Sequence, residues 1–342
     1  MKMMTNFDRL WSEMETEAEA LSGRGILKRR ISSDGRCPMF LGIRQPENRR
    51  AFIIHVAKDV APLPEVLPIS KGFDFEVLIA GDEDRDEDVS IILSAARADY
   101  HEVFAAICDD IFTKLWNLTG SRDAVNSLLK RMRLWQIFFE KQAGEGLSRE
   151  AQIGLYGELH FLRRFVLSLR IDEAVLRSWM GSIKRQHDFQ FGSLSVEVKT
   201  SSAKQHQTLH IASEQQLDES LVARLVLFHL SVSLVENSKD TLPAIIDDIR
   251  QTLAGSEASV EQFDNMLLER GFSDAHCHLY EHTGYSIRRS GFYLVHDEFP
   301  RIKEDELRGG VGDVKYSISL NGCSDYAVSE DDFVNELRRA LQ

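Results

Sequence analysis

Residues 187–200, with the sequence HDFQFGSLSVEVKT, alternate apolar and polar side chains on both sides of a Gly-Ser pair. Alternation with a period of two is typical of a strand whose two faces differ. A two-residue turn at Gly192 and Ser193, a composition that such turns favour, makes this stretch a β-hairpin. The turn pairs Phe189 with Val196 and gathers the apolar side chains on one face, which is how register is normally fixed.

The opposite face of this hairpin carries Asp188, Glu197 and Lys199. The predicted register places Asp188 directly opposite Glu197, with Cβ atoms about 4.5–5.5 Å apart, and Lys199 on a diagonal of about 7–8 Å. Like charges in opposed positions destabilise a sheet, so this face requires compensation. Lys199 supplies some of it, and a divalent cation such as Mg²⁺, which binds carboxylate oxygens, would supply more.

The segment before the hairpin, 149–168, has the periodicity of a helix. Glu158 lies on its apolar stripe, where a carboxylate is costly unless it is paired or bound to a metal. Gly154 and Gly157 flank Glu158 and permit a close approach to a neighbouring element. Two explanations of Glu158 remain: it joins the acidic cluster of the hairpin, or it forms a buried pair with an arginine such as Arg163.

A helical glutamate followed by Asp188 and the triplet Glu197-Val198-Lys199 resembles the core of the PD-(D/E)XK nuclease superfamily. Asp188 stands at the first acid of that motif, Glu197 at its D/E position and Lys199 at its lysine. More narrowly, residues 154–234 resemble bacterial proteins that are grouped with this superfamily and linked to restriction or phage-defence operons.

The resemblance implies a metal-dependent DNA endonuclease of a restriction or anti-phage system. It implies Mg²⁺ as the cofactor, with Mn²⁺ as a substitute, held by Asp188, Glu197 and the Val198 carbonyl. Lys199 would orient or help to deprotonate the attacking water, and Glu158 would bind a second metal or a metal-bound water. DNA is the expected partner. A methyltransferase or ATPase of a restriction system and a second copy of the chain, as in a homodimer, are further partners that the family suggests.

Several alternatives to this site stay open. The charged side of the hairpin is also explained by a solvent-facing surface with a cross-strand ion pair. A second acid-x-lysine triplet, Asp313-Val314-Lys315, lacks the hairpin and is the weaker candidate, as are Gln190 and His206. The residue before Asp188 is His187, where the motif has a proline that its members often replace. In function, the alternative is a catalytically inactive nuclease-like scaffold that binds nucleic acid or a defence-system partner.

The chain as a whole predicts an α/β (α+β) protein in four parts. The parts are a strand-rich lobe (1–95), a helical connector (96–148), a nuclease-like core (149–236) and a C-terminal α/β region (237–342). The resemblance implies that the core is restriction-endonuclease-like, αβββαβ with a mixed central sheet. Apolar runs indicate strands at 39–43, 51–56, 73–80, 208–212, 223–235, 285–296 and 314–320, and helices at 242–253, 259–270 and after Ser329.

Charge and composition exclude several classes of protein. A net charge of −13 argues against a general nucleic-acid coat protein, although residues 158–210 carry more Lys and Arg than Asp and Glu. Phosphate-binding loops, dinucleotide fingerprints and nucleophile elbows are absent from the sequence. We find no apolar run near the ~18 residues of a membrane span and no signal-like start. We therefore expect a cytoplasmic protein without a membrane partner.

Overall fold

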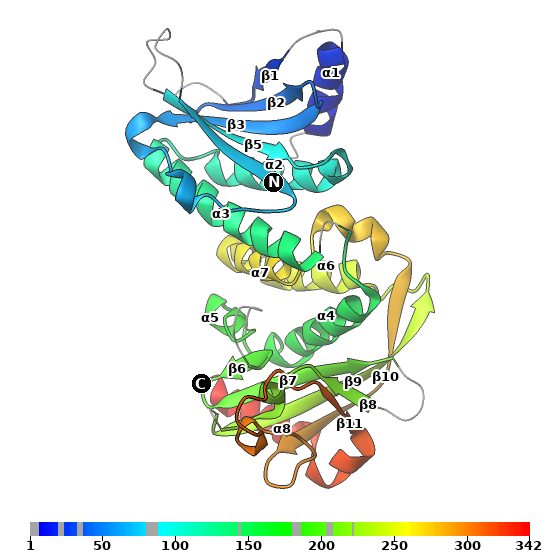
Figure 1. Ribbon diagram of the computed structural model, residues 1–342. Coiled ribbons are helices and arrows are strands. Elements are labelled where there is room, and N and C mark those ends of the chain that lie inside the picture. The colour runs from blue at the N-terminus through cyan, green and yellow to red at the C-terminus, as the bar shows by residue number, and fades with distance from the viewer. Residues whose placement is uncertain are drawn as a thin grey trace. The chain divides into compact units, whose positions relative to one another are not determined.

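The computed structural model describes residues 7–19, 24–32, 37–79, 88–142, 145–179, 186–202, 208–220 and 222–342. The chain divides into two compact units, shown in Figure 1. Unit 1 comprises Met1–Gly146 and Gly271–His276, and unit 2 comprises Leu147–Arg270 and Cys277–Gln342. Helices and several sheets occur in the described ranges, so the predicted mixed α and β composition is confirmed. None of the described helices has the length and apolar composition needed to cross a bilayer.

Unit 1 is built on a five-stranded antiparallel sheet in the order β1-β2-β3-β5-β4. Its strands are β1 (Gly25–Arg30), β2 (Met39–Gln45), β3 (Arg49–Ala57), β4 (Phe73–Ile79) and β5 (Asp88–Ala95). Its helices are α1 (Phe7–Glu19), α2 (His101–Leu115) and α3 (Ser121–Gln142), with 3-10 turns at Lys58–Val60, Pro64–Val66 and Ala98–Tyr100.

The helices of unit 1 share one core with its sheet. Trp11 of α1 is fully buried with its ring 5.9 Å from that of Phe104 in α2, and Phe139 of α3 lies 6.1 Å from Phe73 in β4. The segment expected as a helical connector, 96–148, therefore packs together with the strands of the N-terminal lobe. Strands β1 and β5 were not predicted. β5 takes up the end of the acidic stretch 81–89, most of which lies outside the described residues.

Unit 2 contains a mixed five-stranded sheet in the order β12-β10-β9-β7-β6, in which only β7 and β9 are parallel. Its strands are β6 (Phe189–Phe191), β7 (Leu194–Ser201), β9 (Arg224–Glu236), β10 (Thr283–Val295) and β12 (Ala327–Val328). A separate antiparallel pair consists of β8 (Thr208–Ile211) and β11 (Tyr316–Ser319).

The helices of unit 2 lie close to their predicted positions, except the short helix α5, which was not predicted. They are α4 (Arg149–Phe161), α5 (Glu173–Leu176), α6 (Leu242–Leu253), α7 (Glu257–Glu269) and α8 (Glu330–Ala340). A π-helical turn at Leu162–Val166 extends α4, and 3-10 turns lie at Glu214–Leu217 (η5), Glu304–Glu306 (η7) and Leu320–Tyr326 (η8); η6 (Asp274–Leu279) spans residues of both units. Ser329 caps α8 as predicted, because its hydroxyl accepts a hydrogen bond from the backbone N–H of Asp332.

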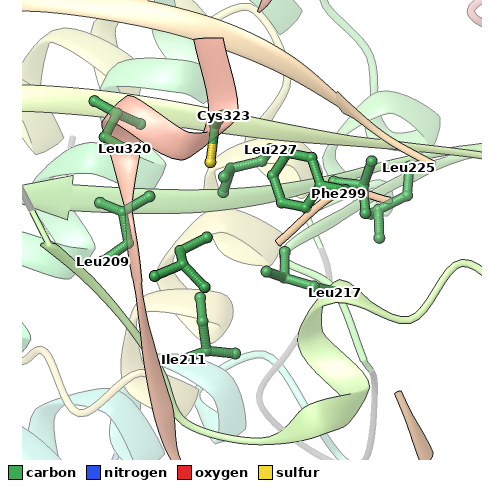
Figure 2. Close-up of a cluster of buried hydrophobic side chains, with 10 residues drawn as sticks. Leu209, Ile211, Leu217, Leu225, Leu227, Phe299, Leu320 and Cys323 are labelled. Atoms are coloured by element: carbon green, nitrogen blue, oxygen red, sulfur yellow. The ribbon is translucent and has the colours of Figure 1, made fainter. Parts of the chain in front are cut away.

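The central sheet of unit 2 is covered on both faces. On one face Phe161 of α4 packs 4.7 Å from Phe189 and 5.2 Å from Phe228, ring centre to ring centre, and Figure 1 shows α4 along this sheet. On the other face the side chains of β8 and β11 join Leu225 and Leu227 of β9 in one apolar cluster (Figure 2). Burial on both sides explains why β9 reads as a continuous apolar run.

Strand β8 departs from the arrangement that the resemblance implied. The expected core places three consecutive strands in one sheet, but β8 pairs with β11. Both edges of β7 are already occupied, by β6 and by β9, so a third partner has no ladder position beside it. β8 instead turns Leu209 and Ile211 onto the apolar part of the sheet (Figure 2).

Candidate functional site

Strands β6 and β7 form the predicted hairpin. Phe189 pairs with Val196, which confirms the register. Gly192 has φ 59°, the left-handed conformation that a type II′ turn requires at its first central position. Just before β6, the Oδ2 atom of Asp188 accepts a hydrogen bond from the backbone N–H of Val198 at 2.8 Å. The Asp188 side chain thus continues the hairpin pairing beyond the backbone ladder.

The face of β7 that carries Glu197 is buried. Glu197 is 1% exposed and its neighbour on the same face, Ser195, is 0% exposed. Both positions lie beside β9, where they pair with Leu227 and Leu225. A solvent-facing hairpin side is therefore wrong as an explanation of these charges.

Burial and mutual repulsion act on both carboxyl groups. Loss of hydration raises the pKa of Asp188 well above its ordinary value, and the negative charges of Glu197 and Glu158 raise it further. Loss of hydration also raises the pKa of Glu197, against the opposing influence of Lys199. Since burial disfavours the ionised forms of both groups, a bound cation would stabilise the pair.

Lys199 lies beside Glu197 on the same strand. Its Nζ atom is 2.8 Å from Oε1 of Glu197 and donates a hydrogen bond to Oε1 of Gln216 at 2.8 Å. Burial lowers the pKa of Lys199, but the charge and hydrogen bond of Glu197 together with the charges of Asp188 and Glu158 outweigh it, and the pKa lies above its ordinary value. Lys199 is consequently a charged ammonium group held between a carboxylate and an amide oxygen.

Glu158 is bound by an arginine other than Arg163. Its Oε2 atom accepts hydrogen bonds from Nε1 of Trp179 at 2.8 Å and from Nε of Arg270 at 2.9 Å. The guanidinium of Arg270 also lies 3.7 Å from the centre of the Trp179 ring. Arg163 pairs with Asp248 instead, at 3.0 Å. The prediction that Glu158 pairs with an arginine is therefore confirmed, but the example given, Arg163, is wrong.

Helix α4 reaches the site through a close contact with β7. A Cβ atom added at Gly157 would lie 1.7 Å from Oγ1 of Thr200, so only glycine permits this approach. Gly154, in contrast, has no atom within 4 Å of such a Cβ and is not needed for the contact. The negative charge of Glu158, one residue after Gly157, therefore acts on Asp188 and Glu197.

The weaker sequence candidates do not join this cluster in the described part of the chain. Gln190 is exposed and donates to the backbone oxygen of Gly192 at 3.5 Å. Asp313 and Lys315 are both exposed, and the backbone N–H of Val314 between them donates a hydrogen bond to Oε2 of Glu214 at 2.8 Å. His206 lies outside the described residues. The Val198 carbonyl as a metal ligand stays a prediction.

Sequence reasoning missed two groups that hold the site residues. Gln216 stands at the capping-box position three residues after Ser213, which does cap η5. The Gln216 side chain instead accepts hydrogen bonds from the backbone N–H of Ala212 and from Lys199. Arg270, at the end of α7, is 112 residues from Glu158. The spacing of Gln216 after Ser213 is a local pattern that marks the residue, whereas no pattern in the sequence links Arg270 to Glu158.

The donor set of this site fits a hard divalent cation. Within the described residues, no group of three or more His, Cys, Asp and Glu side chains is arranged to hold a metal ion. Glu197, which is buried, and Asp188, which is half-buried, nevertheless provide two carboxylates near one another. Mg²⁺ is usually bound through one or two carboxylates and keeps several water ligands. The two acids would hold the ion, with Glu158 as a further negative charge.

Comparison with known proteins places the chain in a family. A family model described as "Putative PD-(D/E)XK family member, (DUF4420)" matches residues 7–321. Searches among curated proteins and among solved structures found no match. The family match extends the resemblance seen over 154–234 to the flanking regions and includes residues of both units. The chain therefore belongs to this family of the PD-(D/E)XK group, DUF4420.

Proposed function

We propose that this protein is a Mg²⁺-dependent DNA endonuclease of PD-(D/E)XK type. The observation that carries the proposal is the set of a buried Glu197 and half-buried Asp188 and Lys199 at one hairpin of a chain whose family is described as "Putative PD-(D/E)XK family member". Burying like charges costs stability unless a cation or a reaction uses them. A role in restriction or anti-phage defence belongs to the proposal and rests on the family resemblance alone.

In the proposed reaction each residue has a distinct task. Mg²⁺, when bound, activates water and stabilises the attacking and leaving oxygens. Asp188 and Glu197 bind the ion, and the hydrogen bond from Val198 to Asp188 orients one of these carboxylates. Lys199 positions the attacking water and offsets the negative charge of the reacting phosphate. Its raised pKa favours this role as a charged donor over that of a base.

Glu158 contributes charge at the edge of the site in this proposal. Its Oε2 atom is occupied by Arg270 and Trp179, which fix the direction of its carboxylate. We propose that it binds a water molecule of the ion's hydration shell or a second ion, as the resemblance implies.

The finer assignment of the fold also belongs to the proposal. α4, β6, β7 and β9 match the order of helix and strands in a restriction-endonuclease-like core, with a mixed sheet. In this assignment β8 occupies the place of the third strand but has moved out of the sheet to pair with β11.

Cleavage of a covalently closed circular DNA tests the activity, because only an endonuclease can open a circle without ends. In Mg²⁺ the wild-type protein should nick or linearise the plasmid. Asp188→Asn should lower the rate about 100-fold or more because it removes a charged ligand of the ion. Lys199→Ala should lower it by a similar factor because it removes a positive charge beside the reacting phosphate. Asp313→Asn and Lys315→Ala change the same residue types in the exposed second triplet and should leave the rate unchanged.

Three results would contradict this function. If the variants of the second triplet lose as much cleavage as Asp188→Asn and Lys199→Ala, the assignment of the active site to the hairpin is wrong. Cleavage of RNA alone would replace DNA as the substrate. Binding of DNA without any cleavage in Mg²⁺ or Mn²⁺ would favour the nuclease-like scaffold. Co-purification tests for a methyltransferase or ATPase partner. The molar mass in solution tests for the homodimer that the family suggests.

A further inference from the structure

An irregularity in β10 brings two arginines together on one side of the central sheet. The ladder between β10 and β9 shifts between Ile287 and Arg289, so Arg288 is an extra residue opposite Ser231. A β-bulge of this kind leaves the extra residue outside the regular pairing and redirects side chains, and bulges are frequent beside active sites. Nε of Arg288 donates a hydrogen bond to Oγ of Ser231 at 3.0 Å. Arg288 therefore lies on the same face as Ser231.

That face is the one on which Glu197 and Lys199 lie. In the parallel pair of β7 and β9, Lys199 is the partner of His229, and Ser201 is the partner of Ser231. In the next pair Ser231 is the partner of Arg289. Paired residues of neighbouring strands project to the same side of a sheet, and residues two apart on a strand do so as well. Arg288 and Arg289 thus share a face with the proposed catalytic group.

The separation between the arginines and Lys199 suits a nucleic-acid strand. Two strand spacings correspond to about 10 Å across the sheet, and two residues to about 7 Å along it, which gives roughly 12 Å in all. One strand of B-DNA advances about 3.4 Å along its axis for each phosphate, so this distance corresponds to about three to four nucleotides. A strand whose scissile phosphate lies at Lys199 could place another phosphate at the bulge.

The surroundings of the bulge are exposed and rich in hydrogen-bonding groups. Residues 286–290 of β10 are all exposed, whereas the strand is buried on both sides of this run, at Tyr285 and Phe292. Towards β7 the face continues with the hydroxyl of Ser201, which is 2.8 Å from Nε2 of His229. Burial lowers the pKa of His229 to about 4, and the charges of the two arginines lower it as well. The imidazole is thus neutral at pH 7, and the arginines supply the positive charge there.

We propose that Arg288 and Arg289 form a phosphate clamp that holds the backbone of the DNA strand entering the Asp188–Glu197–Lys199 site. The inference rests on the proposed nuclease function and extends it by naming where the substrate is held. Because the chain has a net charge of −13, its binding of a polyanion depends on local cations such as these. Arginine also binds phosphate through two parallel N–H groups.

The test measures binding of the full chain to a fluorescent DNA duplex by anisotropy, in EDTA so that no cleavage occurs, over a series of salt concentrations. Arg288→Gln/Arg289→Gln should bind about tenfold more weakly at low salt. The slope of log K against log salt should fall in magnitude by about 2, because each lost phosphate contact contributes about 0.9. Arg288→Lys/Arg289→Lys should restore most of the slope, because it keeps the charges.

The matched control is Arg338→Gln/Arg339→Gln on α8, a pair of consecutive exposed arginines. α8 lies on the opposite face of the sheet, where Phe333 stacks on Phe292 at 4.2 Å. This control removes the same net charge and should leave the affinity and the slope unchanged. Thermal unfolding of all variants verifies that they fold.

The outcomes separate the clamp from the activity. If the double variant at the bulge binds as tightly as wild type, or if both double variants weaken equally, the clamp is wrong. In that case the nuclease proposal still stands provided that Asp188→Asn abolishes cleavage. If the wild-type chain neither binds nor cleaves DNA, both proposals fail. If the bulge variant loses affinity only for an acidic protein partner and not for DNA, the clamp is overturned as well.

Discussion

At the scale of single residues, Arg270 determines how Glu158 can exist at the edge of the site. Its guanidinium contacts the carboxylate and the face of Trp179 at the same time. The Arg270 side chain is 8% exposed and that of Glu158 is 20% exposed, so the pair is largely shielded from water. Removal of one member of such a pair leaves a charge with little solvation, which costs more than the pair itself contributes. Arg163, in the π-helical turn that extends α4, and Asp248 of α6 form a far more exposed pair.

These two arginines give a matched prediction. Arg270→Ala should lower the free energy of unfolding by about 3 kcal/mol, through the uncompensated Glu158 and the lost contact with Trp179. Arg163→Ala should lower it by less than about 1 kcal/mol, because exposed ion pairs contribute little. Urea denaturation of both variants measures the difference. Equal losses would show that the Glu158 pair is not a special contact.

At the scale of elements, the packing of α4 on β7 sets the position of the site. Gly157 touches Thr200, whose stiff β-branched side chain cannot move aside easily. This contact brings the segment that carries Glu158 against the strand that carries Glu197 and Lys199. Helix α4 and strand β7 therefore have to stay in contact for Glu158 to act on Glu197 and Lys199.

A second matched pair tests this contact. Gly157→Ala should destabilise the chain by about 1–3 kcal/mol, the typical cost of overpacking, and should also lower DNA cleavage because Glu158 moves away. Gly154→Ala, on the same helix and facing open space, should stabilise it by about 0.5–1 kcal/mol through helix propensity. Thermal unfolding and the plasmid assay provide the two readouts. A neutral Gly157→Ala would mean that α4 does not need this close approach.

The sequence was informative where structure is local. Alternation and the Gly-Ser turn predicted the hairpin and its register, and periodicity predicted α6 to its last residue. The pairing of β8 with β11 could not be predicted, because it joins short strands far apart in the chain and depends on which edges are already filled. For the same reason the partner of Glu158 was missed. Burial of the charged hairpin face also required knowledge of the elements that cover it.

At the scale of the whole molecule, an acidic chain is proposed to bind a polyanion. Its overall charge of −13 disfavours DNA at long range, so binding must rely on a few local cations. On the face that carries Glu197 they include Lys199 and the two arginines of the β10 bulge. The family match spans residues of both units and is not confined to the hairpin.

We propose above all that the half-buried Asp188 and the buried Glu197 share a cation. The most direct test is a crystal soaked in Mn²⁺, with the ion located by its anomalous scattering. We expect one strong peak between the two carboxylates, at about 2.0–2.3 Å from an oxygen of each, and we expect Asp188→Asn to lose that peak. A crystal that shows no ion there, or carboxylates that turn away from each other, would contradict this proposal.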